Sequence, residues 1–294
     1  MATIDWLKNW DDLVHGTVVF SAAVPFVVCL LIIWKMPADM WWVGIVGGVV
    51  GPVLWLFGLP KLPPATSEDF VFLGVVASAL VLGCMRVPML GVVGAGGIGM
   101  LLFGLLVWFV YPAWLAEDSG LAGKGLVCAG MLATMGLCAG LAEAFGRNQS
   151  AGNAKRIQLP LSALVPPLIG LAVLLQLGGA ARLGQAAGAL ATALATACLL
   201  IIARNRKLHP VGIPALWGMM FALLGWSGWL FAEVRYGLAL ALCLAPIAGF
   251  LSQCVPLPRR GEARFDQLWG GVFSAVIAGV VVAIAVSDYL AEMQ

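Results

Sequence analysis

The feature of this chain that most limits its fold is a series of long stretches without a charged residue. Ten such windows follow one another along the chain. A Lys, Arg or Asp at the centre of a membrane helix costs about 2.5–3.5 kcal/mol on the insertion scale, and about 20 apolar residues cross the hydrocarbon core. Each window is therefore predicted to be one membrane-spanning helix. The windows are 16–34, 40–58, 70–85, 87–114, 125–142, 157–181, 183–203, 211–232, 236–255 and 267–287.

The composition supports the same class of protein. Hydrophobic residues make up 62% of the chain and charged residues 10%, against about 45–50% and about 25% in soluble domains. A water-soluble globule is therefore excluded. A membrane β-barrel is excluded as well, because its strands would alternate apolar and polar residues. The predicted fold is an all-α polytopic transmembrane helix bundle with about ten spans, because helices satisfy their own backbone groups in lipid.

The predicted organisation is a single transmembrane domain, residues 16–294, preceded by a short segment. The longest pieces outside the windows are residues 1–15 and 143–156, and neither is long enough for a soluble domain. Residues 1–15 are predicted to form an interfacial helix on the outer membrane surface, with a frayed polar tail as the alternative. The helix is indicated by an i, i+4, i+7, i+8 apolar spacing at Trp6, Trp10, Leu13 and Val14.

The distribution of basic residues predicts the orientation. Eleven of the 16 Lys and Arg residues fall in connections on one side of the predicted bundle, and the positive-inside rule assigns that side to the cytoplasm. Both termini are then expected outside, in a multi-pass protein of a plasma or bacterial inner membrane. The lipid bilayer is the expected partner. The net charge of +2 is the balance of two opposed surfaces, so no nucleic-acid partner is expected.

Residues that could carry metal or cofactor chemistry are scattered. The seven cysteines lie in or at the ends of windows without a paired spacing, which is typical of small packing residues. The two histidines, His15 and His209, fall at opposite predicted membrane faces. No metal site and no cofactor are therefore predicted.

Two strings look like functional motifs but lack the setting that the motifs need. Gly94, Gly96 and Gly99 match G-x-G-x-x-G inside one apolar window, not between a strand and a helix, so they are interpreted as a packing ridge. Residues 225–232, Gly-Trp-Ser-Gly-Trp-Leu-Phe-Ala, are similar to the GxSGxxxA string around the nucleophile of rhomboid intramembrane proteases. No histidine follows Ser227 to activate it. Ser227 is therefore interpreted as a packing hydroxyl, and no enzyme is predicted.

The chain contains one candidate internal repeat. Residues 21–25, Ser-Ala-Ala-Val-Pro, and residues 162–166, Ser-Ala-Leu-Val-Pro, agree at four of five positions at an offset of 141. Possible halves 16–145 and 157–294 then hold five spans each, the inverted-repeat plan of many secondary transporters. The alternative is a chance match in an Ala-, Val- and Leu-rich chain. If the repeat holds, we expect the first and sixth helices to be kinked near Pro25 and Pro166 and to pack against each other.

The predicted site is a cavity between the halves, lined by weak polar groups and by backbone carbonyls that proline leaves free. No window has an ionisable residue at its centre, which disfavours an ion pump or a buried acid–base enzyme. Midspan hydroxyls such as Thr192 and Ser274 have interhelical hydrogen bonding as their simplest interpretation. The predicted activity is carriage of a neutral or amphiphilic small molecule. The alternative is a non-catalytic membrane subunit that anchors or assembles a larger complex, with other subunits or with itself. The candidate cavity residues are Ser21, Pro25, Ser162, Pro166, Pro167, Gln176 and Gln185.

Overall fold

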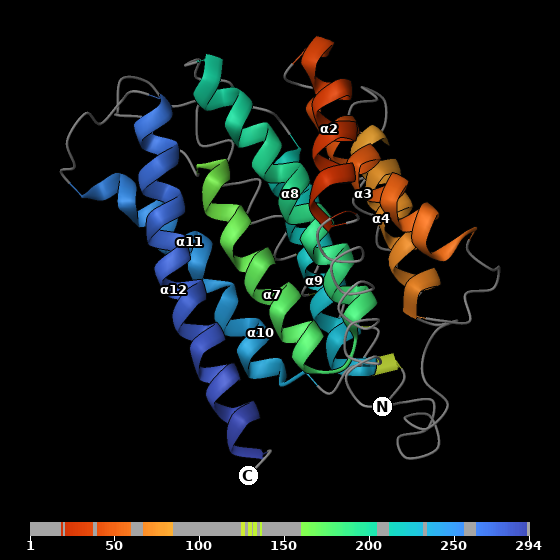
Figure 1. Ribbon diagram of the computed structural model, residues 1–294, viewed down its shortest axis with the longest axis vertical. Coiled ribbons are helices and arrows are strands. Elements are labelled where there is room, and N and C mark those ends of the chain that lie inside the picture. The colour runs from red at the N-terminus through yellow and green to blue at the C-terminus, as the bar shows by residue number, and fades with distance from the viewer. Residues whose placement is uncertain are drawn as a thin grey trace, which may run out of the picture.

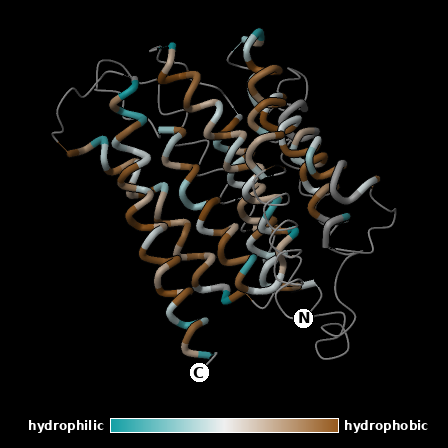
Figure 2. The backbone as a smooth tube through the Cα atoms, viewed as in Figure 1, coloured by the Kyte–Doolittle hydropathy of each residue, from teal (hydrophilic) through white to brown (hydrophobic). Residues whose placement is uncertain are grey.

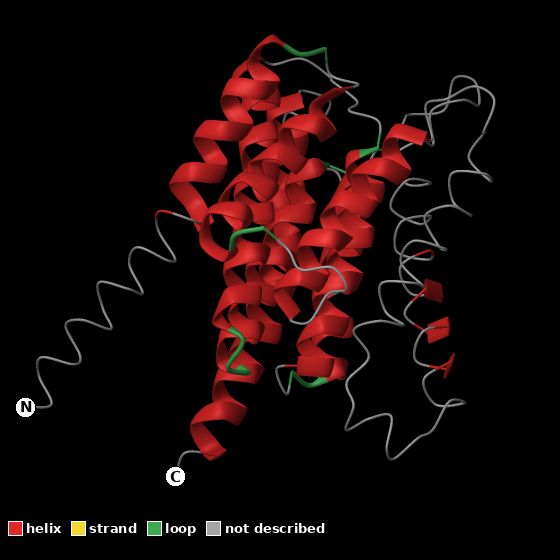
Figure 3. Ribbon diagram, turned by 90° about the vertical axis from the view of Figure 1, so that its right-hand side faces the viewer, coloured by secondary structure: helices red, strands yellow, loops and turns green. Residues whose placement is uncertain are grey.

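The computed structural model is a bundle of helices that run side by side (Figures 1 and 3). Among the residues that it describes there are helices, turns and no strands, which confirms the all-α prediction. Those residues are 19, 21–37, 40–59, 67–84, 125–126, 129–130, 132–133, 136, 160–204, 212–231, 234–255 and 263–292.

The first group of helices comprises α2 (Val24–Lys35), α3 (Trp41–Phe57) and α4 (Ser67–Cys84). A π-helical turn over residues 21–23 leads into α2. α2 packs on α3, and α3 packs on α4. Gly48 on α3 allows α2 and α3 to approach closely, because a Cβ atom there would lie 3.2 Å from both the Cβ of Cys29 and the carbonyl oxygen of Pro25 on α2.

The second group comprises η3 (Leu161–Leu164), α7 (Val165–Leu177), α8 (Ala181–Arg204) and α9 (Ile213–Phe231). α7 and α8 form a hairpin whose turn contains Gly179 at a φ of +82°, a conformation that favours glycine. α8 packs against α2, α3, α7 and α9, so it lies at the centre of the bundle. α9 is buried along almost its whole length.

The third group comprises α10 (Tyr236–Leu242), α11 (Leu244–Leu251), η4 (Ser252–Cys254) and α12 (Ala263–Glu292). The helix is interrupted at Cys243, where Pro246 has no N–H to donate to the carbonyl of Leu242. One face of α12 packs on α7, η3 and α11. The other face is exposed and apolar, with Val272, Val276 and Val280 at successive turns, and hydrophobic residues follow the length of the helices in Figure 2.

The helices fall where the sequence predicts windows. Eight of the ten windows contain helices that the structure describes, whereas 87–114, most of 125–142, residues 1–15 and the Gly94 string lie outside the described residues. In the described part, four helices are long and apolar enough to cross a membrane. They are Ala181–Arg204, Ile213–Phe231, Gly237–Cys254 and Arg264–Glu292. Shorter apolar helices cover Ser21–Lys35, Trp41–Leu54 and Leu161–Leu177, and the ten spans stay a prediction.

The predicted packing of the first helix on the sixth is wrong. α8 lies between α2 and α7 and packs against both (Figure 1). Two glycines one turn apart on α8 make this possible. A Cβ atom at Gly184 would lie 2.9 Å from the carbonyl oxygen of Ala172 on α7, and one at Gly188 would lie 3.0 Å from the Cβ of Ser21. The apolar pattern of the windows does not reveal which neighbour each glycine meets.

Candidate site at two proline-containing helix starts

The two similar pentapeptides have similar local structures. α2 begins at Val24 and α7 at Val165, each with proline in its first turn, and each follows an irregular turn, π-helical before α2 and 3₁₀ before α7. Proline is tolerated there because the first N–H groups of a helix have no partner within it. Both prolines thus stand where a π-helical or 3₁₀ turn passes into an α-helix, and the kinks near Pro25 and Pro166 stay a prediction.

Proline has no backbone N–H, so the carbonyl in the preceding turn that would accept a hydrogen bond from it loses that donor. Pro25 cannot donate to Ser21, four residues earlier, and neither Pro166 nor Pro167 can donate to Ala163. Hydroxyls of neighbouring helices supply donors to these carbonyls. Thr192 Oγ1 donates to the carbonyl oxygen of Ser21 at 2.7 Å, and Ser274 Oγ donates to that of Ala163 at 2.7 Å.

The start of α2 is held on α8 by a group that we term the α2 clasp, formed by Ser21, Gln185, Gly188 and Thr192. Besides the bond from Thr192, Ser21 Oγ donates to the carbonyl oxygen of Gln185 at 3.2 Å. Ser21 is buried, with 7% of its surface exposed. Gly188 leaves room for the serine at this crossing. The clasp joins segments more than 160 residues apart in the chain.

The start of α7 is held on α12 in a similar way, by the α7 clasp of Ser162, Ala163, Gln267, Gly270 and Ser274. Ser162 Oγ donates to the carbonyl oxygen of Gln267, and the Ser162 N–H donates to Gln267 Oε1 at 2.9 Å. A Cβ atom at Gly270 would lie 2.6 Å from Pro160 Cβ, two residues before Ser162, and one at Gly271 would lie 3.3 Å from Ser162 Cβ. The indole N–H of Trp217 donates to the adjacent carbonyl of Leu164 at 2.9 Å.

The two clasping helices share a spacing. Gln185, Gly188 and Thr192 on α8, and Gln267, Gly270 and Ser274 on α12, both follow Q-x₂-G-x₃-[ST]. This i, i+3, i+7 spacing places the three residues on one face of a helix. The cross-helix bonds of Thr192 and Ser274 agree with their interpretation as interhelical hydrogen bonds. Gln267 was not among the predicted site residues, and the shared spacing is the signal that would have identified it.

The seven predicted cavity residues fall in three places. Ser21, Pro25 and Gln185 meet in and beside the α2 clasp, whereas Ser162, Pro166 and Pro167 lie at the α7 clasp. Gln176 is exposed near the end of α7. Both serine hydroxyls donate to backbone carbonyls of neighbouring helices. That these residues line a common cavity stays a prediction.

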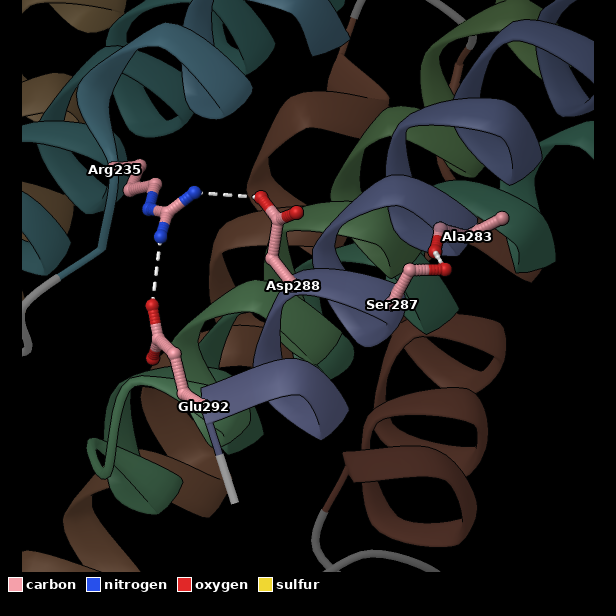
Figure 4. A network of polar contacts seen from close by, with 5 residues as sticks. All are labelled: Arg235, Ala283, Ser287, Asp288 and Glu292. Carbon is pink, nitrogen blue, oxygen red and sulfur yellow. Dashed lines mark hydrogen bonds and ion pairs between the residues drawn. The ribbon is translucent and has the colours of Figure 1, made fainter. Parts of the chain in front are cut away.

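Charged side chains connect helices at the ends of the bundle. Arg204 Nη2 donates to the carbonyl oxygen of Trp34 at 3.0 Å, with its guanidinium 5.4 Å from the centre of that indole ring. Arg235, just before α10, reaches Asp288 Oδ2 at 2.6 Å and Glu292 Oε1 at 2.7 Å near the end of α12 (Figure 4). These side chains are largely exposed, so the ion pairs contribute little stability.

The other candidate residues, Ser227 and Cys29, donate hydrogen bonds to backbone carbonyls. Ser227 is fully buried, and its hydroxyl donates to the carbonyl of Leu223 on its own helix at 2.8 Å, in keeping with a packing role. Cys29 Sγ donates to the carbonyl of Ala193 at 3.4 Å. Within the described ranges no group of three His, Cys, Asp or Glu residues is arranged to hold a metal ion.

Comparison with protein-family models, with curated proteins and with solved structures finds no match to this chain.

Proposed function

We propose that this chain is a membrane carrier for a neutral or amphiphilic small molecule, built from two halves related by an inverted repeat. One observation carries the proposal: the pentapeptides that begin at Ser21 and Ser162 each form an irregular turn followed by an α-helix with proline in its first turn. Discontinuous helices at corresponding places in two inverted halves are typical of substrate sites in secondary transporters.

The order and packing of the helices support the repeat. The starts of α2 and α7 differ by 141 residues, those of α3 and α8 by 140, and those of α4 and α9 by 146. α3 packs on α8, and α4 packs on α9. A pseudo-two-fold axis would bring equivalent elements together in this way, so these two contacts support the repeat, whereas the remaining equivalent pair, α2 and α7, is separated by α8.

The chemistry of the interior supports a neutral solute. In the helices that the structure describes, charged side chains stand near the ends, as Lys35 and Arg204 do, and the polar groups between the ends are hydroxyls, amides, thiols and indole N–H groups. A charged solute would lose its hydration without meeting an opposite charge, which is unfavourable in lipid. We therefore expect hydrogen bonds and apolar contacts to hold the solute.

The orientation is part of the same proposal. α2 and α8 end, and α12 begins, at one end of the bundle (Figure 1), with Lys35, Arg204 and Arg264. Asp288 and Glu292 lie toward the opposite end of α12. We assign the basic end to the cytoplasm on the positive-inside rule, which places both termini outside, in a plasma or bacterial inner membrane.

The test is transport by the purified protein alone. Vesicles that contain the full chain are assayed for uptake of a panel of radiolabelled neutral and amphiphilic solutes. Ser21→Phe and Ser162→Phe should block uptake, because each places a large ring at a helix start that is closely packed. Ser287→Phe is the matched control, because Ser287 is exposed and bonds only within its own helix in the structure. Folded protein that moves none of the solutes would overturn the proposal.

A second candidate function is a membrane subunit that assembles with other chains or with itself. The observation that favours it is the exposure of α12, of whose apolar window only 28% is buried. Exposed small residues recur every fourth position on one face of this helix, a spacing that lets two membrane helices approach closely. They are Ala275, Gly279, Ala283 and Ser287. Co-purification of a partner chain in fixed stoichiometry, together with no solute transport, would favour this function.

A further inference from the structure

The ends of α2 and α8 carry two cations that no carboxylate of the described residues neutralises. Lys35 ends α2 and Arg204 ends α8 at the same end of the bundle (Figure 1), and both residues are exposed. In the described part of the chain neither side chain forms an ion pair. Arg235, toward the opposite end, instead meets two carboxylates of α12 (Figure 4). The positive charge at the ends of α2 and α8 is therefore available to an external anion.

Arg204 is held next to Lys35 by its contact with Trp34. Arg204 Nη2 donates to the carbonyl oxygen of Trp34 at 3.0 Å, and the guanidinium lies 5.4 Å from the centre of that indole ring. Trp34 and Lys35 share a peptide bond, so the guanidinium lies beside the peptide group that leads to Lys35. A guanidinium has five N–H donors, and the bond to Trp34 uses one of them. Both cations can therefore donate to the oxygens of one phosphate group.

An exposed apolar face of α2 leads away from these cations. Val27, Leu31 and Trp34 follow the i, i+4, i+7 spacing of one helix face, and they are 51%, 70% and 58% exposed. Tryptophan is enriched at the headgroup level of membranes, where its ring meets both lipid and water. This face therefore suits an acyl chain, with the two cations at the level of a lipid phosphate.

We propose that the ends of α2 and α8 bind an anionic phospholipid, with its phosphate between Lys35 and Arg204 and an acyl chain along Val27 and Leu31. An anionic lipid is favoured over a zwitterionic one, because the headgroup of the latter carries its own cation. A lipid is favoured over a soluble anion, because the apolar face continues from the charged site. The inference does not depend on the carrier function. The proposed orientation places the site in the cytoplasmic leaflet, where anionic lipids are attracted to basic segments.

The test is competition between two lipids that have the same acyl chains. The purified full chain in detergent micelles receives equal amounts of dioleoylphosphatidylglycerol, which is anionic, and dioleoylphosphatidylcholine, which is zwitterionic. Native mass spectrometry then measures the ratio of the two lipids in the complex with one bound lipid. A basic residue near a membrane surface contributes about fivefold to the affinity for anionic lipid. We therefore expect the phosphatidylglycerol complex to dominate in wild type, and the ratio to fall about fivefold in Lys35→Gln and in Arg204→Gln.

Two further variants separate the site from general charge and from folding. Arg235→Gln removes the same charge from an arginine that already has two carboxylate partners, so it should leave the ratio unchanged. Arg204→Lys keeps the charge and should keep most of the wild-type preference. An equal fall in all three Gln variants, or no fall in either Lys35→Gln or Arg204→Gln, would overturn the inference.

A second measurement distinguishes a lipid from a soluble anion. Equilibrium dialysis of the same protein with radiolabelled inorganic phosphate should show no binding that Lys35→Gln or Arg204→Gln abolishes. Phosphate binding that both substitutions abolish would mean that the site takes a soluble anion, and would overturn the assignment to a lipid.

Discussion

The packing of α11 on α12 and η3 predicts a large effect of a single methyl group. Gly249 lies on α11, and a Cβ atom there would lie 2.8 Å from the carbonyl oxygen of Gly270 on α12 and closer still to the Cβ of Ala163 on η3. None of these atoms belongs to a flexible side chain. Gly249→Ala therefore requires the helix itself to move.

The magnitude follows from comparison with a second glycine. Alanine is favoured over glycine in a helix by up to about 1 kcal/mol, and overpacking a tight contact costs about 1–3 kcal/mol. Gly279 lies on α12 with nothing within 4 Å of the added Cβ, so Gly279→Ala has the gain without the cost. The difference in unfolding free energy between the two variants should therefore equal the overpacking cost, about 1–3 kcal/mol.

The assay is reversible unfolding of the purified protein in mixed micelles by titration with sodium dodecyl sulfate. Gly249→Ala should unfold at a lower mole fraction of this detergent than wild type, and Gly279→Ala at an equal or higher one. Equal unfolding free energies for the two variants would refute the close approach of α11 to Gly270 and Ala163.

Two further predictions concern the ends of the bundle. Arg235→Gln should lower the unfolding free energy by less than about 1 kcal/mol, because both ion pairs of Arg235 are largely exposed. The difference from wild type should shrink as the salt concentration is raised. A larger loss of unfolding free energy that persists in high salt would contradict this prediction. Reporter fusions after Lys207 and after Gln294 should lie in the cytoplasm and outside, respectively, since the basic connections define the inner side; a cytoplasmic reporter after Gln294 would contradict the proposed orientation.

The sequence is informative about the helices because the bilayer limits the choices of the backbone. An uncharged window must satisfy its own N–H and C=O groups, so 211–232 and 183–203 predict α9 and α8 to within a few residues. The division of 236–255 into α10, α11 and η4 was missed, although Pro246 marks the place. The neighbours of a helix were not predictable, because every face of these windows is apolar and periodicity does not select one face.

At the candidate site, too, the sequence predicts some features and not others. Proline positions identify which carbonyls lose an intrahelical donor, and so predict that Ser21 and Ala163 need another partner. They do not identify the helix that supplies it, because that depends on tertiary packing. Thr192 on α8 and Ser274 on α12 were therefore predictable as hydrogen-bonding residues, but not as the donors to these two carbonyls.

The two clasps differ in a way that predicts different roles. The positions 141 residues before Gln185 and Thr192 are Gly44 and Gly51, so the proposed repeat duplicates the helix starts and not the residues that hold them. The α2 clasp joins the proposed halves, whereas the α7 clasp lies within the second half. Only the α2 clasp would therefore be strained by a movement of the proposed halves relative to each other.

Ser274→Ala should consequently act on stability and Thr192→Val on transport. Ser274→Ala removes the hydroxyl that donates to the carbonyl of Ala163, to which neither Pro166 nor Pro167 can donate. The unfolding free energy should therefore fall by about 1–3 kcal/mol. The rate of solute uptake per folded molecule should change little. Thr192→Val should change that rate severalfold, and Thr192→Ser, which keeps the hydroxyl, should restore it. Uptake in vesicles, normalised to folded protein, measures both effects. Equal changes in uptake for Ser274→Ala and Thr192→Val would mean that the boundary between moving parts does not follow the contact of α2 with α8.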